Sequence, residues 1–103
     1  MATGVSVEKI KEVVGRMEHP EIAATFQELG MVGNVREAGD GIIIEVRVPF
    51  PNIPIKDYLA GMIRREVAKI AEEIPLSFDF TVMPDEVRSQ FLLLARSRWK
   101  GEI

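Results

Sequence analysis

The sequence predicts one α+β domain with the element order α-β-β-α-β-α and a mixed three-stranded sheet, whose helices pack mainly on one face. Three observations predict this fold. The chain has 103 residues, the length of a single domain, so we expect residues 1–103 to form one unit. Apolar residues recur at helical spacing in three stretches, and β-branched or alternating stretches lie between them. A hairpin followed by a strand–helix–strand crossover makes the sheet mixed.

The first helix is expected from Val5 to Met17. Ser6 is its expected N-cap, and Pro20 stops it because the residue before a proline avoids the helical region. Residues 21–29 leave room for one short helical turn before Gly30. The apolar face of this helix comprises Val7, Ile10, Val13, Val14 and Met17.

A β-hairpin is expected over residues 31–48, with its turn at residues 38–41. The first arm, residues 31–37, contains Gly33 and Asn34, which indicate a bulge or an edge strand. In the second arm, Glu45 and Arg47 should face outward. Four residues of this arm should face the core: Ile42, Ile44, Val46 and Val48.

A stiff loop follows, because prolines cannot donate to a strand ladder. It consists of Pro49, Phe50, Pro51, Asn52, Ile53 and Pro54. The longest helix is expected next, over residues 55–73, and Pro75 ends it. Its apolar stripe comprises Ile55, Leu59, Met62, Ile63, Val67, Ile70 and Ile74.

The third strand is expected over residues 76–83, since its residues alternate without a break. The last helix is expected over residues 84–100, with Pro84 in its first turn and Gly101 as its C′ residue. Acids open this helix and cations close it, as the helix dipole favours. The apolar face of the strand comprises Leu76, Phe78, Phe80 and Val82.

Composition excludes several functions. The chain has no cysteine, which excludes disulfides, thiolate metal sites and cysteine nucleophiles. Its net charge of −3 disfavours a general grip on nucleic acid. It has no run of 18 apolar residues and no signal-peptide pattern, so we expect a cytoplasmic protein without membrane contact.

The residues give no catalytic constellation. His19 is the only histidine, and one histidine makes neither a zinc site nor a serine triad, so a structural or solvated role is expected. The carboxylate pairs Glu72/Glu73 and Asp85/Glu86 are interpreted as solvated charge. We therefore expect no enzyme, no cofactor and no metal.

Two features indicate binding. The loop at residues 49–54 joins a buried strand to a helix N-terminus, where α/β folds tend to place ligands. Phe50 and Ile53 either plug the core or serve as exposed anchors for a partner. The stretch Phe91 to Ala95 is apolar in every direction, so the last helix either packs under the first helix or contacts another chain as a weak homodimer.

The order of these motifs resembles a small domain of iron–sulfur cluster assembly, the domain of unknown function numbered fifty-nine, as in SufT and PaaD and before the ATPase of Mrp/ApbC carriers. The resemblance covers residues 5–82, and the stretch Pro54 to Asp57 looks closest to the Mrp/ApbC branch. The matching positions are Pro20, Glu21, Gly30, Lys56 and Asp57.

The resemblance implies a domain that binds assembly factors or recipient proteins. This chain departs from the family in three places: His19 replaces the usual aspartate before Pro20, Pro49 and Phe50 stand where the family has threonines, and Ile53 stands where it has a cysteine. Thiolates are the usual ligands of such clusters. The sequence therefore predicts a non-catalytic accessory protein that acts by protein–protein contact and ligates no cluster. The alternative is a stand-alone interaction domain of unrelated function on the same fold.

Overall fold

A computed structural model describes residues 7–71 and 74–100. The predicted α+β class and element order are confirmed. The expected caps Ser6 and Gly101, and the pair Glu72/Glu73, lie outside the described residues. The elements are α1 (Val7–Arg16), β1 (Val32–Ala38), β2 (Gly41–Val48), α2 (Lys56–Ala68), β3 (Leu76–Val82) and α3 (Asp85–Ser97).

The sheet has the strand order β1-β2-β3, so β2 is central. β1 pairs with β2 in antiparallel fashion, and β3 pairs with β2 in parallel. Gly39 has a φ of 64°, which suits the two-residue turn between the paired residues Ala38 and Gly41. The pairing register shifts between Val32 and Val35, which confirms the predicted bulge, and β1 is also an edge strand.

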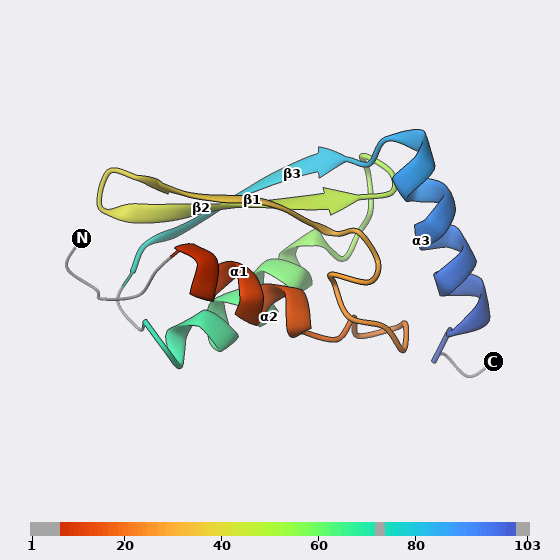
Figure 1. Ribbon diagram of the computed structural model, residues 1–103, viewed down its shortest axis with the longest axis horizontal. Coiled ribbons are helices and arrows are strands. Elements are labelled where there is room, and N and C mark those ends of the chain that lie inside the picture. The colour runs from red at the N-terminus through yellow and green to blue at the C-terminus, as the bar shows by residue number, and fades with distance from the viewer. Residues whose placement is uncertain (1–6, 72–73, 101–103) are drawn as a thin grey trace.

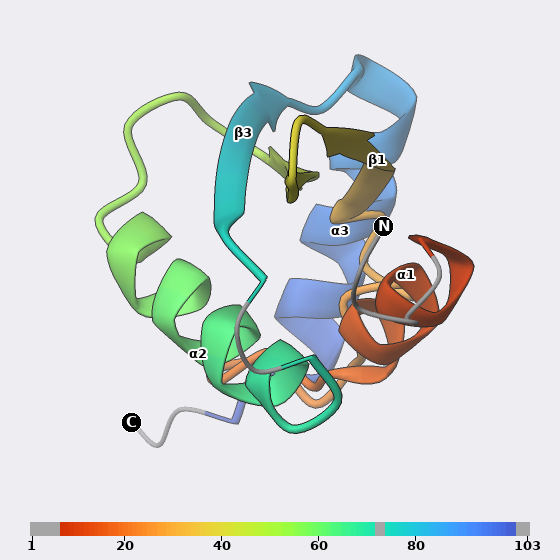
Figure 2. The ribbon, with the colours of Figure 1, turned by 90° about the vertical axis from the view of Figure 1, so that its left-hand side faces the viewer.

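The core lies between one face of the sheet and two helices. α1 lies beneath β1, and α2 lies beneath β3 (Figures 1 and 2). The four predicted core residues of β2 are all buried there, and they share one hydrophobic cluster with Ile10 and Val14 of α1. α2 contributes Leu59, Ile63 and Val67 to the same cluster. The alternation of apolar and polar residues in β2 therefore predicted correctly which side chains face the core.

Polar side chains hold the opposite face of the sheet. The Glu45 carboxylate accepts hydrogen bonds from the Asn34 backbone N–H, at 2.9 Å, and from the Thr81 hydroxyl, at 2.8 Å. These two bonds, assisted by the Arg47 guanidinium, hold the pKa of Glu45 below its usual value. Because Glu45 bonds to both neighbouring strands, it ties all three strands together.

α2 is shorter than predicted. It ends at Ala68 instead of residue 73, because the N–H groups of Lys69 and Ile70 bond to carbonyls three residues back. Such bonds wind the chain into a tighter turn than an α-helix. Ile70 consequently leaves the apolar stripe and is exposed, whereas Ile74 is buried as expected.

The last strand follows its predicted alternation, whereas the last helix is shorter than predicted. Val82 pairs with the buried Val48 but is itself exposed, because it is the last residue of the edge strand β3. α3 ends at Ser97 instead of residue 100, because residues 98–100 pair with the segment before β1. In that pairing the Ala23 N–H donates to the Arg98 carbonyl, at 2.8 Å.

α3 closes one end of the molecule instead of lying under α1 (Figure 1). Its buried side packs against the segment between α1 and β1. The Phe91 ring lies 6.4 Å from the His19 ring, in an edge-on arrangement. A Cβ at Gly30, where φ is 73°, would lie 2.6 Å from the Val87 side chain, so only glycine fits where this segment passes α3.

Candidate functional site

The loop at residues 49–54 lies at the end of the sheet where three segments meet. Val48 pairs with Val82, so the parallel strands β2 and β3 finish together. The Met83 N–H donates to the Val48 carbonyl, at 2.8 Å, and α3 begins two residues later. The loop then arcs outside β3 to reach α2 (Figure 2). It is therefore framed by the ends of β3, α2 and α3.

Burial divides this loop into anchored and exposed residues. Pro49 is buried, and Ile53 is half-buried and packs against the core. Phe50 is 48 % exposed. The two interpretations of the loop therefore apply to different side chains: Ile53 helps to close the core, and Phe50 is available to a partner. Pro51, Asn52 and Pro54 are exposed as well.

Arg88 of α3 holds Phe50 in place. Its guanidinium carbon lies 5.7 Å from the centre of the Phe50 ring. One of its nitrogens donates to the Pro49 carbonyl at 3.4 Å, and another pairs with Asp85. An exposed cation–π contact of this kind contributes about 0.5–1 kcal/mol. Phe50 is therefore an exposed aromatic ring with a defined orientation.

Two further exposed apolar residues flank the loop. Val82 ends β3, and Tyr58 lies in the first turn of α2. We refer to the exposed side chains at this end of the sheet as the loop surface. The loop surface comprises Phe50, Pro51, Asn52, Pro54, Tyr58 and Val82.

The positions that match the family motif separate into two places. Lys56 and Asp57 open α2 beside the loop surface, where Asp57 is exposed and the Lys56 ammonium lies 5.6 Å from the centre of the Phe80 ring. Pro20, Glu21 and Gly30 belong to the segment that packs against α3. The two motifs therefore do not form one site.

His19 has a structural role. It is 5 % exposed, and its Nδ1 accepts a hydrogen bond from the Glu21 N–H at 2.9 Å. Burial lowers the pKa of His19, the Glu21 carboxylate opposes that shift, and the Lys100 ammonium adds to it. An aspartate at this position can accept the same N–H in an Asx turn. The imidazole of His19 thus closes a turn with the backbone of Glu21.

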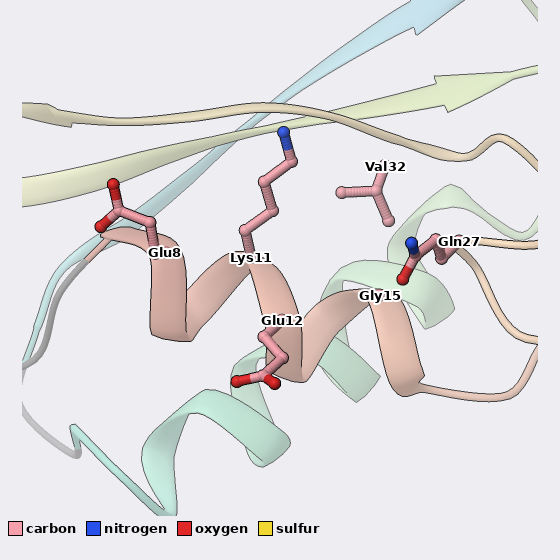
Figure 3. A pocket seen from close by; sticks show the side chains of 6 residues that line it. All are labelled: Glu8, Lys11, Glu12, Gly15, Gln27 and Val32. Carbon is pink, nitrogen blue, oxygen red and sulfur yellow. The ribbon is translucent and has the colours of Figure 1, made fainter.

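The described residues contain no metal-binding cluster. No group of three or more His, Asp or Glu side chains among them could hold a metal ion. The hollow between α1 and β1, of about 460 Å³, is lined by four charged or polar side chains together with Gly15 and Val32, and Lys11 extends from α1 toward the strand (Figure 3). Among the described helices, none has the length and hydropathy needed to cross a membrane.

The fold is similar to that of a solved structure. A crystal structure of a domain of unknown function, DUF59, from Bacillus anthracis superposes with a TM-score of 0.60. The two sequences are 14 % identical, and the match covers 86 % of this chain and 91 % of that chain. No protein-family model and no curated protein matches the sequence. The chain therefore has the fold of a DUF59 domain, as its sequence resemblance implied.

Proposed function

We propose that this chain is a non-catalytic accessory protein in iron–sulfur cluster assembly or protein maturation, which works by binding other proteins. It would have a role similar to that of domains of the SufT and PaaD type. The observation that carries the proposal is Phe50, an exposed ring that Arg88 holds on a proline-bounded loop. This loop occupies the position of the functional loop of the family that the sequence resembles.

The loop surface has the properties of a protein-binding site. Aromatic residues dominate the energetics of many interfaces, because they bury much area at a small cost in conformational entropy. Pro49, Pro51 and Pro54 restrict the backbone on both sides of Phe50, so little loop ordering remains to oppose binding. Nothing in this surface requires chemistry beyond contact.

Cluster ligation is not part of the proposed function. The chain contains no cysteine. Ile53, which stands where the family has its cysteine, is half-buried and packs against the core. Iron–sulfur clusters are held mainly by thiolates. The partner, an assembly factor or a recipient protein, must therefore hold the cluster.

The alternative function is a stand-alone interaction domain with an unrelated task. The missing cysteine favours this alternative, because the domain keeps its fold without it. Both functions use the loop surface, and the identity of the partner separates them. In both cases we propose a cytoplasmic protein that binds neither nucleic acid nor membranes.

Affinity enrichment from extracts of the source cells tests the proposal. Wild type and two variants, Phe50→Ser and Ile70→Ser, serve as baits, and mass spectrometry identifies the bound proteins. Ile70 is a matched control because it is also apolar and exposed but lies two residues beyond the C-terminal end of α2, away from the loop surface. We expect assembly factors or iron–sulfur proteins with wild type and Ile70→Ser, and their loss with Phe50→Ser.

Two results would count against the proposal. Bound proteins that are insensitive to Phe50→Ser would show that the loop surface is not the binding site. Bound proteins that depend on Phe50 but have no link to iron–sulfur chemistry would favour the alternative. Circular dichroism of each bait checks that the fold is intact.

A further inference from the structure

The outer face of α3 carries a leucine with no partner in the described chain. α3 buries Phe91 on its inner side, and Leu93 is 59 % exposed. Figure 1 shows α3 at one end of the molecule, with the sheet and the other helices all on one side of it. Helical spacing places Glu86, Ser89 and Arg96 on the same outer face as Leu93.

Two charges on this face also lack a partner among residues 7–71 and 74–100. Glu86 and Arg96 lie near opposite ends of α3, and neither side chain takes part in an ion pair or hydrogen bond among the described residues. By contrast, Arg88 pairs with Asp85 and Arg98 lies 3.8 Å from Glu28. The outer face is thus acidic at one end, apolar in the middle and basic at the other end.

The same face is hollowed near its acidic end. A shallow, open depression lies there, lined by Glu86, Val87, Ser89 and Gln90. Leu93 projects one helical turn further along. A projecting leucine and a depression therefore lie side by side on one helix.

We propose that this face binds a second copy of the chain, with the two α3 helices antiparallel about a two-fold axis. The axis crosses the face midway between Ser89 and Leu93. Leu93 of each copy then enters the depression beside Ser89 of the other copy. Glu86 precedes Ser89 by three residues, and Arg96 follows Leu93 by three residues. The midpoint between Glu86 and Arg96 therefore lies on the same two-fold axis, which also places Glu86 of one copy against Arg96 of the other.

This self-complementarity favours a second copy over an unrelated protein. A two-fold contact uses the same surface on both partners, so every projection or charge on that surface needs a matching hollow or opposite charge on the same surface. The outer face of α3 has both: Leu93 matches the depression, and Glu86 matches Arg96. A single pair of three-turn helices buries little area, which places the dimer among weak interfaces, with an expected dissociation constant of about 0.1 mM. The proposed dimer does not use Phe50, so its test is independent of the test of the proposed function.

Sedimentation equilibrium with a charge-swap cycle tests the dimer. We expect wild type to dimerise, and Glu86→Arg or Arg96→Glu alone to weaken the dimer about tenfold, because like charges then face each other. The double variant Glu86→Arg/Arg96→Glu restores opposite charges and should dimerise within about threefold of wild type. Leu93→Ser should abolish the dimer, and Ile70→Ser should not change it.

These positions are exposed, so the variants should fold, and thermal melting checks that they do. A wild type that remains monomeric at about 1 mM would overturn the proposal, since that concentration lies tenfold above the expected constant. It would also be overturned by a double variant as weak as the single ones, or by a dimer that survives Leu93→Ser.

Discussion

His19 is the only buried polar or charged residue in the described chain, and its burial makes stability sensitive to pH. Protonation would place a charge among Phe26 and Phe91 and would remove the lone pair that accepts the Glu21 N–H. The folded state therefore binds this proton more weakly than the unfolded state does, where the pKa is about 6.5.

The sign of this linkage gives a testable prediction. As the pH falls below about 6.5, the unfolded state takes up a proton first, so the free energy of unfolding decreases by at most about 1.4 kcal/mol per pH unit. Below the folded-state pKa of His19 the decrease stops. Urea denaturation at several values between about pH 7.5 and 5 measures it, a window above the usual carboxylate range.

His19→Asn is the matched control for this measurement. The asparagine oxygen can accept the Glu21 N–H but does not titrate. Since the chain has no other histidine, most of the slope should disappear in this variant. An unchanged slope would show that His19 does not carry the effect.

Residue-level features were predictable only where they depend on local pattern. The four core residues of β2 followed from their alternation, and the bulge at Gly33 and Asn34 followed from weak strand propensity. The contact between Arg88 and Phe50 had no signal in the sequence. These residues belong to different elements, and only the parallel pairing of β2 with β3 brings them together.

At the scale of elements, two glycines should respond in opposite ways to an added methyl group. A Cβ at Gly41 would lie 2.6 Å from the backbone oxygen of Pro75, which is held by the Ile42 N–H at 2.9 Å. The start of the β2–β3 pairing would have to shift. We expect Gly41→Ala to destabilise the fold by about 1–3 kcal/mol.

Gly61 provides the opposite case. It lies inside α2, and a Cβ there would meet only an Arg65 nitrogen, at 3.9 Å. Alanine is a better helix former than glycine, so Gly61→Ala should stabilise the fold by about 0.5–1 kcal/mol. Thermal or urea unfolding measures both variants. Equal effects of the two substitutions would contradict the packing described at Gly41.

The ends of the helices could not be predicted from periodicity. Helical apolar spacing continues past Ala68 to Ile70 and Ile74. The chain nevertheless leaves the helix after Ala68, because the Pro75 carbonyl must reach the N–H of Ile42 at the start of β2. α3 likewise stops at Ser97 because the segment before β1 offers a backbone partner. In both cases a tertiary contact overrides local propensity.

At the scale of the whole molecule, the account predicts that the purified chain holds no iron–sulfur cluster by itself. The sequence has no cysteine, and carboxylates and one histidine are poor ligands for soft clusters. Anaerobic reconstitution with iron and sulfide, followed by desalting and absorption spectroscopy, tests this prediction. A stoichiometric visible chromophore that stays with the protein would contradict it.

The fold of the whole molecule was predictable because six elements with clear periodicity allow few arrangements in one small domain. The place of α3 was not. Phe91 determines which face of α3 is buried, because its ring packs beside the ring of His19. His19 lies in a segment without a helix or strand, so its position could not be predicted from periodicity. The candidate site was half predictable: the loop followed from its prolines, but its orientation depends on α3.

The proposed support of iron–sulfur proteins through Phe50 can be measured in cells. The activities of iron–sulfur enzymes are compared in source cells that lack the gene and express either wild type, Phe50→Ser or Ile70→Ser at equal levels. We expect reduced activities in the deletion strain, recovery with wild type and Ile70→Ser, and no recovery with Phe50→Ser. Unchanged activities in the deletion strain, or full recovery with Phe50→Ser, would contradict it.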